Sequence, residues 1–181
     1  PAVRAQAFPA KPIRLIVPFA PGGTSSVVAR SVADELTRQL GQSVVIDNKG
    51  GGGGVTAMAE AKAAAPDGYT LIITHVGTLA VNPYMLKSRP YDVNRDFAPV
   101  TLLAKVPNVF VVNPSVPAKT MQELVAWIKA QTKPVNYGSG GVGSIGHIVG
   151  EMFKQQYGLN MEHVPYKGSG PMHRDLLGGP P

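Results

Sequence analysis

Residues 13–26 have the sequence IRLIVPFAPGGTSS, in which an apolar strand runs through a glycine turn into the start of a helix. Glycine lets the backbone approach a ligand closely, and the unpaired N–H groups of a helix's first turn favour an anion. A second stretch of this kind, VNYGSGGVGS, occupies residues 135–144. Two such turns in one chain predict a cleft protein that holds a carboxylate or a phosphate.

The composition is that of a folded chain with many tight loops. The 181 residues are 44% hydrophobic and 15% charged, with 21 glycines and 17 prolines and no collagen-like period. The net charge of +6 comes from scattered Lys and Arg, which form no basic stripe, so we expect no nucleic-acid partner. The sequence has no cysteine, which excludes disulfides, thiolate metal ligands and cysteine nucleophiles.

The first residues and the apolar runs bear on targeting. No apolar run approaches the roughly 18 residues of a membrane-spanning helix, so no direct membrane insertion is expected. Ala5-Gln6-Ala7 fits the small-x-small pattern at the end of a secretory signal. Residues 1–7 are therefore a candidate signal-peptide remnant.

Strands and helices alternate along the chain. Helical periodicity begins at residue 24, where Val28, Val32, Leu36 and Leu40 share one face before Gly41. It returns after a capping box at 120–123 and over 145–157. Strands are predicted over residues 13–17, 43–47, 70–74, 100–104, 109–113, 135–137 and 161–164. This order predicts an α/β protein with mostly parallel sheets covered on both faces, whose ligand lies beyond the carboxyl ends of the strands.

A break at Pro107-Asn108 divides the chain into two predicted lobes, residues 1–104 and 105–181. The second lobe has only two convincing strands and two or three helices, and a domain this short buries a small share of its surface. We therefore expect the second lobe to be incomplete and the chain to be truncated at its C-terminus.

The glycine loop at residues 138–143 also matches the dinucleotide pattern G-x-G-x-x-G, with Glu162 about twenty residues on. The strand before it is short and polar, and Glu162 falls near the start of the next strand rather than at its carboxyl end. The loop favours a backbone nest for a smaller anion. An NAD-type oxidoreductase domain using residues 138–143, and a tight turn without a ligand, remain as alternatives.

Other catalytic patterns are missing from the sequence. Ser139, Ser144 and Ser169 lie outside any G-x-S-x-G elbow, and no H-E-x-x-H pair occurs among the histidines. The loops offer no pair of acidic residues for general acid and base roles. We therefore expect no enzyme, no metal and no cofactor.

Two further loops follow the ends of predicted strands and lie beside the predicted anion sites. Thr78 offers a hydroxyl after the third strand, or serves only as a helix cap. Tyr166 is a candidate to pack on an apolar ligand body, and Lys167 is either a cleft cation or a solvated one.

Several segments occur in a characteristic order. They are KPIR (11–14), VPFAPGG (17–23), DNK (47–49), APDGYTL (65–71), NP (82–83), YD (91–92), DFAPV (96–100), VNPS (112–115) and HVPYKG (163–168). On these segments the chain resembles the solute-binding receptors of tripartite tricarboxylate transporters, the Bug family, over essentially its whole length. The resemblance implies a periplasmic, two-lobed clamshell, like other periplasmic binding proteins, that captures a small organic carboxylate and presents it to a membrane permease.

The resemblance also implies site residues. The loop at 19–23 is expected to hold ordered waters against the ligand, with the helix start at 24–26 beside it, and residues 139–144 are expected to bind the far carboxylate. Ser26 stands where many relatives have Asp, so an amino-acid ligand is not expected. With Tyr166 from the loop analysis, the predicted ligand-binding residues are Phe19, Ala20, Gly22, Gly23, Thr24, Ser26, Gly77, Thr78, Ser139, Gly140, Gly143, Ser144 and Tyr166.

Overall fold

The computed structural model describes residues 7–88 and 90–178. Its first sheet has the strand order β2-β1-β3, formed by β1 (Ile13–Val17), β2 (Val44–Asn48) and β3 (Thr70–Ile72). All pairings are parallel, and Leu15 lies between Ile46 and Leu71. The β1 and β3 strands were predicted from their apolar runs, and β3 is two residues shorter than expected.

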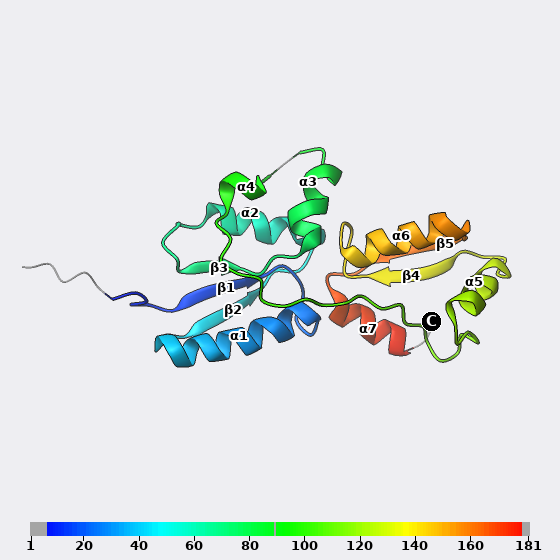
Figure 1. Ribbon diagram of the computed structural model, residues 1–181, viewed down its shortest axis with the longest axis horizontal. Helices are drawn as coiled ribbons and strands as arrows, with labels where there is room; N and C mark the ends of the chain where they lie inside the picture. Colours follow the sequence, from blue (N-terminus) through cyan, green and yellow to red (C-terminus); the bar gives the residue numbers. More distant parts are fainter. Residues whose placement is uncertain (1–6, 89, 179–181) are drawn as a thin grey trace, which may run out of the picture.

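Helices cover both faces of the first sheet (Figure 1). Along β1, Ile13, Leu15 and Val17 face α1 (Thr24–Leu40), because alternate residues of a strand point to opposite faces. The other face carries Arg14 and Ile16 and is covered by α2 (Val55–Ala63), which follows the short turn η1 (Gly52–Gly54). The face of α1 that packs on the sheet carries Ala29 and Ala33. The predicted valine and leucine stripe lies beside it, half-buried except for Leu40, which is exposed.

The second sheet is a parallel pair, β4 (Val135–Ser139) and β5 (Met161–Pro165). The long helix α6 (Ile145–Tyr157) covers one face, and α7 (Ser169–Gly178) lies on the other (Figure 1). Near the far end lies α5 (Met121–Lys129), which begins with the predicted Thr120 cap. The core of this lobe consists of Leu124, Ile128, Phe153, Leu159 and Met161.

The carboxyl ends of the strands in both lobes point to the region between the lobes (Figure 1). Three short helices complete the first lobe: η2 (Gly77–Val81), α3 (Asn82–Met85) and α4 (Val93–Asp96). Within the described residues, no helix combines the length and apolar character that a membrane crossing requires.

The strands predicted over residues 100–104 and 109–113 are wrong. This stretch is extended but forms no ladder, and Val100 and Val109 are 82% and 76% exposed. Its β-branched residues have strand propensity, yet a strand also needs a partner edge, and no described strand lies beside it. The predicted lobe boundary at residue 105 falls in this connecting stretch and stays a prediction. Of the candidate signal remnant, residues 1–6 lie outside the described part of the chain.

Candidate functional site

Four loops meet between the lobes, and we call them the cleft loops: residues 19–26, 74–78, 139–144 and 166–170. They contain hydroxyl groups and glycines but no Asp or Glu. All four loops contribute to one large hollow, which also extends along much of residues 96–113 and into both lobes. The cleft-loop residues that line it are Phe19, Gly23, Thr24, Ser25, Thr74, His75, Val76, Ser139, Gly140, Ser144, Tyr166 and Ser169. Seven of these were predicted site residues, whereas Ser25, Thr74, His75, Val76 and Ser169 were not.

Three helices begin at this hollow. The first residues of α1 and α7 are Thr24 and Ser169, and α6 starts after Ser144. Each helix N-terminus carries a partial positive charge of about half an electron, since its first N–H groups have no partner within the helix. Gly23, before α1, has no side chain with which to cap them. The hollow is therefore electrostatically suited to an anion.

The two lobes touch through backbone on both sides of the hollow. On one side the N–H of Ala20 donates to the carbonyl of Lys167 at 2.8 Å. A Cβ at Gly23 would lie 2.6 Å from Ser169 Oγ, so a larger residue there would displace the Ser169 side chain. On the other side the Gly143 backbone lies against the Asn82 side chain. The two lobes therefore contact each other at the cleft loops.

Ser139 organises the loop that it belongs to. Its side chain is buried, and its Oγ lies 3.1 Å from both the N–H and the carbonyl of Gly141 and 2.7 Å from His163 Nε2. One hydroxyl has one proton and two acceptor positions, so all three contacts are satisfied when it donates to the Gly141 carbonyl and His163 carries its proton on Nε2. In this arrangement the hydroxyl holds the turn in shape.

The stacked rings of Tyr137, His163 and His147 lie beside the same loop and support it. The rings of His147 and His163 lie 4.0 Å apart, and the Tyr137 ring lies 5.0 Å from His163. His147 Nδ1 accepts the N–H of Gly143 at 3.2 Å. Burial, and then the charge of His147, lower the pKa of His163, which favours the neutral form of the His163 ring.

Ser144 caps α6 and still has a proton to donate. Its Oγ accepts the N–H of His147 at 3.3 Å, as an N-cap serine does. Because this bond uses only an acceptor position, the O–H proton remains for a ligand in the hollow.

Ser26 and Thr78 are buried beneath the cleft loops. The Ser26 hydroxyl accepts from Asn48 Nδ2 at 2.9 Å, and the same amide donates to the carbonyl of Phe19. Thr78 Oγ1 donates to the His75 carbonyl at 3.0 Å. Neither side chain lines the hollow, so in this arrangement both support loop backbone.

His75 lies three residues after the end of β3 and belongs to the first lobe. Its ring lies 4.7 Å from that of Phe19, and its Nδ1 accepts the N–H of Gly77 at 2.9 Å. Burial lowers the pKa of His75 to about 4, which keeps the imidazole neutral at physiological pH. His75 directly follows the strand predicted over residues 70–74, which was the available signal, but it was not among the predicted site residues.

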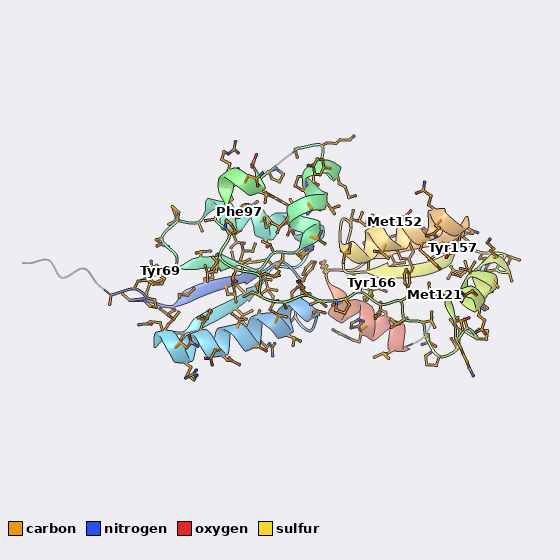
Figure 2. The ribbon with its side chains drawn as sticks, viewed as in Figure 1. Tyr69, Phe97, Met121, Met152, Tyr157 and Tyr166 are labelled. Atoms are coloured by element: carbon orange, nitrogen blue, oxygen red, sulfur yellow. The ribbon has the colours of Figure 1, made fainter. Side chains whose placement is uncertain are left out.

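Tyr166 lies in the second lobe near α7 (Figure 2). Its hydroxyl donates to Asp175 Oδ2 at 2.9 Å, which raises the pKa of the phenol. A Cβ on Gly138 would lie 3.2 Å from the Tyr166 ring, so the ring closes over the end of β4. Tyr166 also lines the hollow.

The dinucleotide alternative is not supported. In the parallel register Glu162 pairs with Asn136, three residues before the carboxyl end of the pair at Ser139 and Pro165. An acidic residue that binds a ribose must lie at that carboxyl end. The described residues hold no cluster of three or more side chains suited to a metal ion.

Comparison with known proteins agrees with this fold. Residues 28–180 match the model of the tripartite tricarboxylate transporter family receptor. Protein BugT of Bordetella pertussis is 41% identical over 98% of this chain and 55% of its own length. The chain spans about half the length of the curated relatives it matches.

Solved structures show the same architecture. Rpa4515 of R. palustris, determined with adipate, has a TM-score of 0.89 and 39% identity, covering 93% of this chain and 56% of its own. MatC of Rhodopseudomonas palustris, determined with bound malate, has a TM-score of 0.86 and 32% identity, covering 93% and 57%. The two-lobed, periplasmic-binding-protein-like fold is thereby confirmed. The chain belongs to the family of tripartite tricarboxylate transporter receptors.

Proposed function

We propose that this chain acts in a periplasmic solute-binding receptor that captures a small organic carboxylate between its lobes and presents it to a membrane permease. It binds its ligand without transforming it, in line with a family of receptors rather than enzymes. The observation that carries the proposal is the meeting of three helix N-termini from two lobes at one hollow.

The chemistry of the cleft loops supports an acid as the ligand. Backbone N–H groups and the hydroxyls of Thr24, Ser25 and Ser144 replace the water that a carboxylate loses on entry. Hydrogen bonds to a charged acceptor contribute about 1.5–3 kcal/mol each, so a few of them support micromolar binding after the costs of association.

The ligand class is narrowed by what these loops do not contain. With no Asp or Glu in any cleft loop, an ammonium group would find no charged partner among these loops. We therefore propose a mono- or dicarboxylate rather than an amino acid. The relatives determined with adipate and malate hold ligands of this chemistry.

A thermal-melt screen of the purified chain tests the proposal. A ligand that binds only the folded state raises the melting temperature by mass action. We expect adipate or malate, or a related dicarboxylate, to raise it, and aspartate, NADH and ATP to leave it unchanged. A screen in which the nucleotides stabilise and no organic acid does would overturn the proposal.

A further inference from the structure

The run of five glycines at residues 50–54 lies outside the hollow but touches the second lobe at both of its ends. At one end, a Cβ at Gly50 would lie 3.1 Å from the carbonyl oxygen of Lys167, the group that accepts the N–H of Ala20. At the other end, a Cβ at Gly53 would overlap the carbonyl oxygen of Val142. The glycine run is therefore a surface of the first lobe on which the backbone of two cleft loops rests.

The first lobe holds the glycine run in one conformation. Asn82 Nδ2 donates to the carbonyl of Gly53 at 3.0 Å, and the N–H of Gly54 donates to the carbonyl of Gly51 at 3.1 Å. The φ angles of residues 51–54 lie between 57° and 123°, a region that glycine enters at little cost. The side chain of Asn82 is buried and lies against Gly143 of the second lobe. The second lobe thus meets a fixed turn here rather than a loose loop.

The loop that touches Gly53 also borders the hollow. Ser139, Gly140 and Ser144 line the hollow, and residues 141–143 between them contact the first lobe. Because the Val142 carbonyl is a backbone group in a packed contact, an atom added at Gly53 must push the whole loop away. The first turn of α6 follows Ser144 directly, so its N–H groups move with the loop. The spacing between the N-termini of α1 and α6 therefore depends on the contact at Gly53.

We propose that Gly53, held by Asn82, is a positioning residue that sets the spacing between the anion-binding N–H groups of the two lobes. This inference rests on the proposed function, because only a ligand bonded to both lobes needs that spacing. A hydrogen bond near 2.9 Å loses most of its strength when its partners separate by about 1 Å. Gly53 therefore acts on the affinity for the acid without touching it.

Two alanine substitutions separate this role from backbone strain. Gly53 has a φ of 60° and Gly52 a φ of 57°, so an alanine is equally strained at either position. At Gly53 the new methyl group meets the Val142 carbonyl of the second lobe. At the exposed Gly52 it meets only Thr56 Oγ1, at 3.6 Å, and Val55 Cβ, at 3.9 Å. Gly52→Ala is thus the matched control for Gly53→Ala.

The experiment is calorimetric titration of the wild type and both variants with adipate and with malate, beside melting curves that show each variant to be folded. We expect Gly53→Ala to bind the acid about fivefold or more weakly than Gly52→Ala, because overpacking against backbone displaces the loop. A Gly53→Ala variant that binds as tightly as Gly52→Ala, or more tightly, would overturn the inference and leave the proposed function standing. A wild type that binds neither acid would instead contradict the proposed function.

Should Gly53→Ala fail to fold, the wild type decides. A Cβ at Gly141 would lie 3.8 Å from Gly53 Cα, so the α-protons of these two glycines are close enough for a nuclear Overhauser effect. We expect this effect in the wild type at saturating adipate, and its absence there would overturn the inference.

Discussion

The hydroxyl of Ser139 is expected to stabilise the second lobe rather than to contact the ligand. Ser139→Ala removes the partner of the Gly141 N–H, of the Gly141 carbonyl and of His163 Nε2. Gly141 is buried, and each unsatisfied buried group costs about 1–3 kcal/mol. Because the half-buried His163 can regain water, we expect the free energy of unfolding to fall by roughly 2–4 kcal/mol.

Urea unfolding measures this loss. The single tryptophan, Trp127, packs against the core of the second lobe and reports its unfolding by fluorescence. Ser144→Ala is the control, because it removes only the cap of α6 and should cost about 1 kcal/mol of stability while weakening carboxylate binding. The reasoning is refuted if Ser139→Ala loses less than about 0.5 kcal/mol of stability yet binds acids much more weakly, since the hydroxyl would then serve the ligand.

Three further outcomes are expected. A Cβ at Gly77 would lie 2.6 Å from the carbonyl oxygen of Gly143 in the other lobe. Gly77→Ala should therefore lower the free energy of unfolding, measured in urea, by about 1–3 kcal/mol and weaken acid binding by holding the lobes apart. Unchanged affinity would contradict this contact between the lobes. A Cβ at Gly146 on α6 would contact only Ser139, with its Cβ at 3.5 Å. Gly146→Ala should therefore leave the free energy of unfolding unchanged or raise it by up to about 1 kcal/mol. A loss of stability would argue against this packing. Because the pKa of His75 is lowered from 6.5 to about 4 in the folded chain, the unfolded chain takes up a proton at this residue at a higher pH than the folded chain does. Stability should therefore be full above pH 6.5 and decline toward pH 4, by on the order of 3 kcal/mol from this residue. His75→Asn should flatten that decline, and an equal pH slope in both proteins would count against a buried, neutral His75.

Local signals in the sequence were sufficient for much of the fold. The glycine turns at 19–23 and 138–143 lie at strand ends as predicted, and Thr120 accepts the N–H of Glu123 as the capping box requires. Gly41 and Gly158 end their helices in the left-handed conformation. Each of these features depends on residues a few positions apart, which is why a sequence can specify them.

The failures concern partners that are distant in sequence. Apolar residues over 100–104 and 109–113 have strand propensity but pair with no described strand. Ser26 and Ser139 stay predicted ligand residues, but in the fold their hydroxyls accept hydrogen bonds from Asn48 and His163, which are distant in sequence. The burial of His75 Nε2 without a partner could not be predicted either, because it too depends on contacts between distant residues.

A crystal structure of the chain with adipate tests the central claim most directly. We expect a carboxylate between the lobes, within hydrogen-bond distance of first-turn N–H groups of α1 and of α6. Adipate bound outside the hollow, or held by one lobe alone with the helix N-termini unoccupied, would contradict it.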